Sequence, residues 1–170
     1  MNIFCTHPDP VNSAMDHCAV HCRKMIVEVA QMLSTCHRIL DGDNVADERG
    51  LYKTTHQNHP SSKWIRGGYD NYVWAYEHFK ALGELYEVST GKVHKTIYKL
   101  QDALQCPPVN ISSTKLTLPT PAVPHKYMRF KNVPSIYKNY LNDKFLEWTT
   151  RDKPVKLHWY LGKPDWVFKV

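Results

Sequence analysis

The chain of 170 residues lacks the features that place a protein in a membrane or outside the cell. No hydrophobic run approaches the roughly 18 residues that a membrane-spanning helix requires. The N-terminus has no charged region followed by an apolar signal segment, and there is no internal repeat and no low-complexity tract. We therefore expect a monomeric, cytoplasmic protein with no membrane contact. At this length it should form one domain, residues 1–170, that folds without disulfide staples.

Cysteines occur in an odd number, and acidic residues are fewer than basic ones. Three of the five cysteines lie on one face of a predicted helix, and free thiols in a reducing compartment explain them better than disulfides. The five are Cys5, Cys18, Cys22, Cys36 and Cys106. Lys and Arg number 22 against 16 Asp and Glu, a net charge of +6. This excess favours an anionic partner such as nucleic acid.

The stretch from Asp16 to Leu40 predicts a long helix with two stripes along it. Apolar residues recur at steps of three and four and draw one continuous face. They are Met15, Cys18, Cys22, Met25, Val29, Met32 and Cys36. A polar stripe runs about 100° further round and consists of His17, His21, Lys24, Glu28 and Gln31. We expect a central helix whose polar stripe borders a cleft. An ordinary solvated helix edge is the alternative.

Further helical periodicity predicts an all-α fold, a compact bundle around this N-terminal helix. We expect its main partner to be an aromatic-rich helix over 70–88, followed by a shorter helix over 92–104. Residues 41–59 are expected to form a loop, and six prolines in residues 107–134 predict an ordered loop wrapped over the helices. The expected N-caps are Asp16 for the long helix, Ser61 or Ser62 for a following turn, and Ser135 for the last helix.

The C-terminal tail, residues 149–170, alternates basic and aromatic side chains. Such a pattern suits DNA, because the charges attract the phosphate backbone and the rings can stack on bases. The expected DNA-binding residues are Arg151, Lys153, Lys156, His158, Trp159, Tyr160 and Lys163. The alternative is a tail that its own tryptophans hold against the core.

Several short signals occur in a characteristic order. Ser13 to Asp16 follow the N-terminal opening, Glu28 follows Lys24 at a distance of four, and His59-Pro60 precede an aromatic helix. Together with Gln31-Met32-Leu33 and with Trp64, this order resembles the pyrimidine-dimer DNA glycosylases of the bacteriophage endonuclease V type. The resemblance covers about the first 90 residues.

The resemblance implies a DNA glycosylase with an abasic-site lyase activity, which acts on double-stranded DNA and needs no cofactor and no metal. The N-terminal amine, here on Met1, attacks the sugar carbon of the damaged nucleotide and forms an imine, and Glu28 assists the proton transfers. α-Amines are less basic than lysine side chains, which makes them better nucleophiles at neutral pH. The substrate-binding residues would be His17, His21, Lys24, Gln31, His56, His59, Trp64 and Arg66.

Two departures from the family leave the substrate open. Met1 is expected to be retained because Asn2 is bulky, whereas the phage enzyme exposes a small residue. The segment between Asp16 and Lys24 is also about two residues longer than in the family. The expected substrates are therefore a pyrimidine dimer, another modified base or an abasic site alone. Each would be reached by flipping the nucleotide out of the duplex.

Two other functions are compatible with the same residues. His17 and His21 have the spacing of two metal ligands on a helix, and His56 and His59 could complete the set for a metal-dependent hydrolase with Glu28 as its base. Lys24 argues against that site, since it would repel the cation. A DNA-binding module without catalysis is the second alternative.

Overall fold

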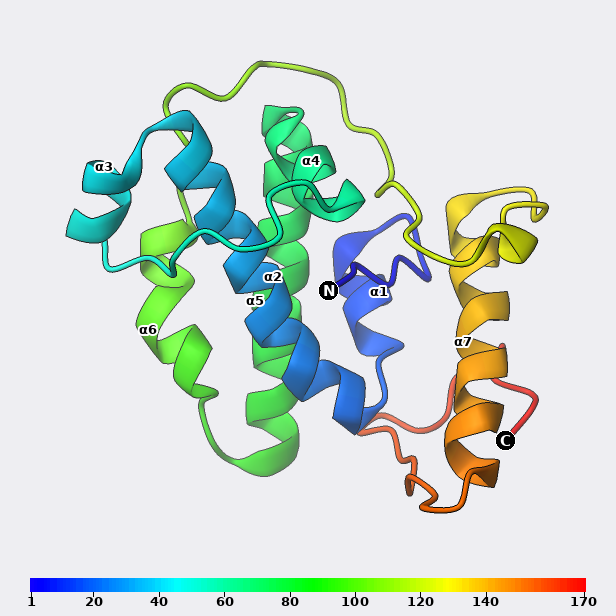
Figure 1. Cartoon of the computed structure of the whole chain (residues 1–170). Coiled ribbons are helices and arrows are strands. Elements are labelled where there is room, and N and C mark those ends of the chain that lie inside the picture. Colours follow the sequence, from blue (N-terminus) through cyan, green and yellow to red (C-terminus); the bar gives the residue numbers. More distant parts are fainter.

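The computed structural model describes all 170 residues and is entirely helical, which confirms the all-α prediction. Seven α-helices and one short 3₁₀ helix, η1, follow one another along the chain (Figure 1). Their bounds are α1 Pro10–Met15, α2 Ala19–Leu40, α3 Asp43–Glu48, α4 Pro60–Arg66, α5 Tyr69–Thr90, α6 Lys95–Leu104, η1 His125–Tyr127 and α7 Val133–Thr150. No helix combines the length and the apolar character needed to cross a membrane.

Helix α2 packs against four other helices, α3, α4, α5 and α6, and α5 is its main partner, as predicted. Its apolar face is fully buried and includes Met25, Val29 and Met32. Tyr72 and Phe79 of α5 are fully buried as well. Burial of these side chains is the main favourable contribution to folding, because each removes a large apolar area from water.

The start of α2 differs from the prediction because the expected capping side chain makes other contacts. Helix α2 begins at Ala19, and Cys18 occupies its N-cap position. Asp16 instead ends α1, and it accepts hydrogen bonds from two tryptophans of the C-terminal tail. Asp16 is therefore unavailable as the N-cap of α2, and that prediction was wrong.

Three further boundaries were wrong for similar local reasons. The predicted loop at residues 41–59 contains α3, whose Asp43 and Asp47 both bind the buried guanidinium of Arg38. Helix α4 is capped by His59 in place of a serine, and α7 is capped by Asn132 in place of Ser135. In α4 and α7 a proline in the first helical turn lies ahead of the expected cap and moves the start of the helix there.

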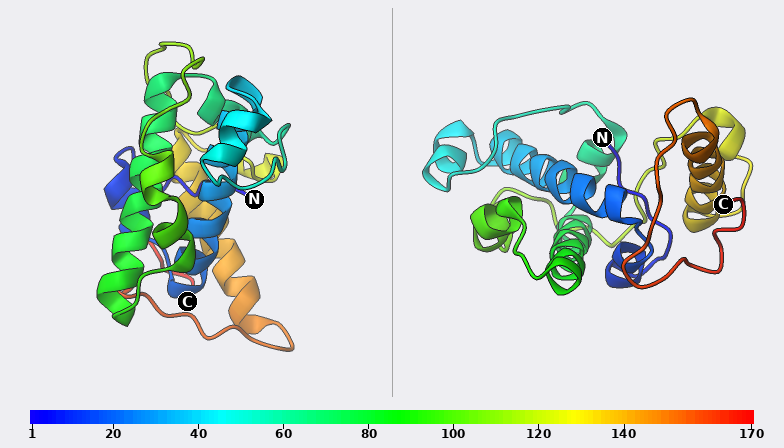
Figure 2. Two further views of the ribbon diagram at one scale, coloured as in Figure 1. Left: turned by 90° about the vertical axis from the view of Figure 1, so that its left-hand side faces the viewer. Right: turned by 90° about the horizontal axis from the view of Figure 1, so that it is seen from below.

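The N-terminal segment lies between α2 and α7, as the right-hand view of Figure 2 shows. Phe4 contacts His21 of α2 and Tyr137 of α7, with ring centroids 4.7 and 6.0 Å away. Asn2 donates to the carbonyl of Ala122 at 2.9 Å and accepts from the Tyr137 hydroxyl at 2.7 Å. The first residues of the chain are thus held on both sides, and the position of the α-amine is fixed with them.

The C-terminal tail is attached to the core by its tryptophans. The indole of Trp159 donates to the carbonyl oxygen of Asp16 at 3.2 Å, and that of Trp166 donates to the Asp16 carboxylate at 3.0 Å. The Ala19 amide donates to the carbonyl of His158 at 2.9 Å, which joins the tail to the start of α2. For the tryptophans, the structure therefore agrees with a tail held against the core.

Candidate active site

The α-amine of Met1 faces the carboxylate of Glu28 on α2. The two groups are 3.6 Å apart, measured from the amine nitrogen to Oε2. The same oxygen accepts a hydrogen bond from the Asn2 amide at 3.1 Å. Lys24, one turn earlier on α2, places its Nζ 3.2 Å from Oε1. The structure thus brings together the amine and the carboxylate that the sequence singled out, and adds a second amine beside them.

This group of side chains lies between buried and open surroundings. The Met1 side chain is 3% exposed, and its sulfur lies 4.0 Å from the hydroxyl of Ser62 on α4. A retained methionine is therefore accommodated by the protein. The Glu28 side chain is 13% exposed, and that of Lys24 is 61% exposed. A ligand can approach Lys24 from solvent, whereas the amine is held at the inner end of the site.

His59 is the one predicted histidine that lies close to the amine and the carboxylate. Its pKa is lowered by burial first and then by the Met1 amine and His56, while Glu28 acts in the opposite direction. Its Nδ1 accepts a hydrogen bond from the Ser61 amide at 3.2 Å and caps α4. Since Nδ1 is an acceptor, the neutral ring carries its proton on Nε2. His56 is exposed in the preceding loop.

His17 and His21 were predicted to contact substrate, and the structure corrects this. They are only 4% and 2% exposed and lie in an aromatic cluster with Phe4, Phe145 and Trp148. Burial lowers the pKa of His17 to about 4 and that of His21 well below its usual value. The polar stripe of α2 therefore changes character along its length, from core at His17 to site at Glu28.

The remaining predicted substrate residues are divided between structure and surface. Trp64 is 6% exposed, and its indole donates to the carbonyl of Thr117, so it holds the proline-rich loop against α4. Arg66 donates to the Gln57 carbonyl at 2.6 Å and so closes the loop that precedes α4. Gln31 is half-buried on α2, one turn beyond Glu28. None of these contacts involves the amine or the carboxylate.

The predicted DNA-binding residues of the tail also fall into two groups. Trp159 and Tyr160 are half-buried. The Trp159 ring packs edge-on against Phe145, with ring centroids 5.4 Å apart, and is therefore part of the protein's own core. The charged and imidazole side chains are exposed: Arg151, Lys153, Lys156, His158 and Lys163.

Two residues that hold the site were missed by sequence analysis. Asn2 and Tyr137 fix the N-terminal segment through their mutual hydrogen bond, although 135 positions separate them. The Tyr137 hydroxyl also accepts from the Ala122 amide at 3.2 Å. No local pattern in the sequence indicates that the Tyr137 hydroxyl has its partner near the N-terminus.

The ligands of the metal alternative do not converge. No group of three or more His, Cys, Asp or Glu side chains is placed to hold a metal ion. His17 and His21 have ring centroids 6.3 Å apart inside the aromatic cluster, whereas His59 caps α4.

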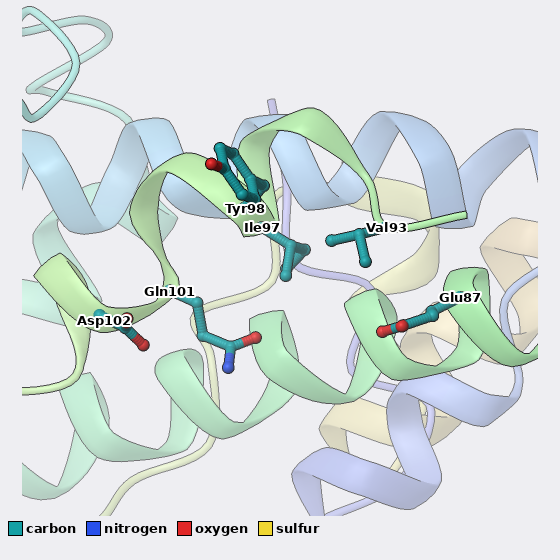
Figure 3. A pocket seen from close by; sticks show the side chains of 6 residues that line it. All are labelled: Glu87, Val93, Ile97, Tyr98, Gln101 and Asp102. Atoms are coloured by element: carbon teal, nitrogen blue, oxygen red, sulfur yellow. The ribbon is translucent and has the colours of Figure 1, made fainter. Parts of the chain in front are cut away.

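A pocket of about 240 Å³ lies between α5 and α6, away from the amine and the carboxylate. Figure 3 shows Val93 and Ile97 between the two helices, with Glu87 at one end and Asp102 at the other. Ile97 approaches α5 at Gly83, where a Cβ would lie 2.4 Å from its Cδ1. With two carboxylates and no basic side chain, this pocket is unsuited to a phosphate-bearing substrate.

The buried histidines predict that the protein loses stability in mild acid. Burial lowers the pKa of His17 and His37 to about 4 and that of His78 to about 3. The unfolded chain therefore binds more protons below pH ~6.5, and stability, complete above that pH, falls as the pH drops toward 4. Each of these histidines should lower the free energy of unfolding at pH 5 by about 2 kcal/mol. Urea unfolding at pH 7.5, 6 and 5 would measure this loss.

Replacing one buried and one exposed histidine provides the control. His17→Gln should reduce this pH dependence by about one proton, whereas His125→Gln, at an exposed position, should leave it unchanged. Equal stability of the unaltered protein at pH 7.5 and pH 5 would contradict the neutral burial of these rings.

No family model, no curated protein and no solved structure matches the chain. What the site can do is therefore inferred from the chemistry of its own residues, above all from the amine and the carboxylate that face each other across 3.6 Å.

Proposed function

We propose that the protein is a DNA glycosylase with abasic-site lyase activity, and that the Met1 amine is its nucleophile. The observation that carries this proposal is the amine of Met1 held 3.6 Å from the Glu28 carboxylate. The burial of the N-terminal segment supports it, because a free N-terminus seldom has a reason to be fixed beside a carboxylate. The order of signals that resembles the pyrimidine-dimer glycosylases leads to the same two residues.

The proposed reaction begins when the neutral amine attacks C1′ of a nucleotide that has been flipped out of the duplex. A bond forms between nitrogen and C1′, and the bond from C1′ to the base breaks, so that the base leaves with the electron pair. The amine then loses a proton, the sugar ring opens between C1′ and O4′, and O4′ is protonated. Glu28 is positioned to carry this proton between nitrogen and oxygen.

The resulting imine makes the C2′ proton acidic. Its removal expels the 3′ phosphate by β-elimination, and water then releases the cleaved strand from the amine. An abasic site would enter the same sequence without the loss of a base. The chemistry requires an amine, a carboxylate and a phosphate-binding cation, and the site offers Met1, Glu28 and Lys24.

Lys24 is the rival nucleophile, because its Nζ also touches Glu28. Two features favour Met1. α-Amines are the less basic of the two kinds of amine, and a larger fraction is neutral at pH 7. The Lys24 side chain is also 61% exposed, whereas that of Met1 is packed beside Ser62. We assign Lys24 to the phosphate that flanks the target nucleotide.

Borohydride reduction tests the nucleophile directly. With duplex DNA that carries an abasic site or a cyclobutane dimer, reduction should trap a covalent adduct, and peptide mapping should place it on the Met1 nitrogen. Lys24→Arg should still form the adduct, because arginine keeps the charge but cannot form an imine. Mapping of the adduct to Lys24 would overturn the assignment to Met1, and the absence of any adduct would leave a non-catalytic DNA-binding module as the better explanation.

Removal of the carboxylate should slow turnover strongly while leaving the fold intact. Glu28→Gln keeps the size of the side chain and should slow strand cleavage about 100-fold or more, the usual contribution of a positioned acid–base group. Glu84→Gln, on the exposed side of α5, removes the same charge at a distance and should have no effect. Cleavage at the normal rate by Glu28→Gln would show that another group moves the proton.

We further propose that His59 orients the substrate beside the amine. The ring is fixed by the Ser61 amide, so its Nε2–H is the free donor for an oxygen of the sugar or phosphate. The groups that influence its charge are the Met1 amine, His56 and Glu28. His59 also lies in the turn of α4 whose Ser62 contacts Met1.

Comparison of His59 with His94, which makes the same capping contact, distinguishes substrate orientation from helix capping. His94 caps α6 as His59 caps α4, and each Nδ1 accepts from an amide at 3.2 Å. Asn preserves a cap at either position. His59→Asn should raise KM and remove the acidic inflection from the pH profile of cleavage, whereas His94→Asn should change neither. If the two variants behave alike, His59 only caps its helix.

A further inference from the structure

The net charge of the protein is confined to its C-terminal part. Residues 1–121 contain 12 Lys or Arg and 12 Asp or Glu, and are neutral in sum. Residues 122–170 contain 10 Lys or Arg and 4 Asp or Glu, so the whole excess of +6 lies there. This part consists of η1, α7 and the tail. The Met1–Glu28 pair therefore lies in the neutral part, next to a basic one.

Most basic residues of this part lie in two groups beyond the ends of α7, while the helix itself carries Lys138 and Lys144. Three exposed cations, Lys126, Arg129 and Lys131, precede its first turn, and three more, Arg151, Lys153 and Lys156, follow its last. The 18 residues of α7 make a helix about 27 Å long. A DNA strand advances about 3.4 Å per nucleotide, so the two groups of cations are separated by roughly eight base pairs.

Aromatic rings support the cations in the same region. Of the six contacts between a cation and the face of an aromatic ring, five lie between residues 126 and 166. Lys144, in the middle of α7, lies over the rings of both Tyr140 and Trp148. A ring face beneath a cation attracts it and so helps to hold the charged group in place.

Lys144 connects this region with the site. Its Nζ lies 5.1 Å from the ring centroid of Trp148, and the Trp148 ring lies 5.0 Å from that of His21, one turn before Lys24 on α2. Lys24 in turn contacts Glu28 at 3.2 Å. A polyanion that follows α7 would thus pass Lys144 and meet Lys24 beside the amine.

We propose that duplex DNA docks along α7, with its phosphate backbone on Lys126, Arg129 and Lys131 at one end and on Arg151, Lys153 and Lys156 at the other. The tail predicted from the sequence is then one end of a longer surface, which we call the α7 surface. The choice of DNA as the partner rests on the proposed function. Docking itself is independent of the amine chemistry and can be measured on undamaged DNA.

The test compares three variants that lose the same charge at different places. Lys126/Arg129/Lys131→Gln and Arg151/Lys153/Lys156→Gln alter the two ends of the α7 surface. Lys92/Lys95/Lys115→Gln is the control from the neutral part, and all nine positions altered in the three variants are exposed. Each variant lowers the net charge from +6 to +3. Fluorescence anisotropy of an undamaged 20-base-pair duplex, titrated at several salt concentrations, gives the affinity and its salt dependence.

Each end variant should reduce the slope of log K against log salt by about 2.7, since each phosphate contact contributes about 0.9. The control should keep the slope of the unaltered protein. An equal loss in the control would show that only the total charge matters and would overturn the surface. The α7 surface would also be overturned if only the tail variant had an effect, or if a single-stranded RNA of equal length bound more tightly than the duplex. Absence of a borohydride adduct would refute the lyase reaction while leaving this measurement intact.

Discussion

The structure depends on how the first residues of the chain are held between α2 and α7. The hydrogen bond between Asn2 and Tyr137, 2.7 Å long, ties the N-terminal segment to α7, and Phe4 fills the space beside it against His21. The direct contacts between α2 and α7 include those of His21 with Phe145 and Trp148, and the N-terminal segment and the tail lie between the rest of the two helices. The same contacts that close the core therefore also place the Met1 amine at Glu28.

Charge and chemistry are divided between the two parts that this segment joins. The neutral part provides the amine and the carboxylate, and the basic part provides the α7 surface. Such a division has a physical advantage, because a cluster of cations around Glu28 would compete with the proton transfers expected of it. Lys24 is the one basic side chain that touches the carboxylate in addition to the amine. On the proposed function, a polyanion would be attracted by one surface and react at another.

The sequence predicted the helices well because their signals are local. Apolar periodicity located α2, α5, α6 and α7, while the exact ends depended on contacts with distant residues, as Asp16 shows through its bonds to Trp159 and Trp166. The polar stripe of α2 identified Glu28 and Lys24, but it could not show that Phe4 and Trp148 cover His21 farther along the same stripe. Spacing describes a single helix face, whereas burial is decided by the elements packed on it.

The long sequence separation of the contacts at the N-terminus has a consequence for synthesis. Asn2 meets Tyr137 across 135 positions, and Asp16 meets Trp166 across 150. Chain segments emerge from the ribosome in order, and contacts this distant form only when nearly the whole chain is available. A growing chain can build α2 and α5 early, yet the Asn2 side chain lacks its hydroxyl partner until Tyr137 of α7 has been made. The segment that carries the Met1 amine is thus complete long before the contacts that hold it can form.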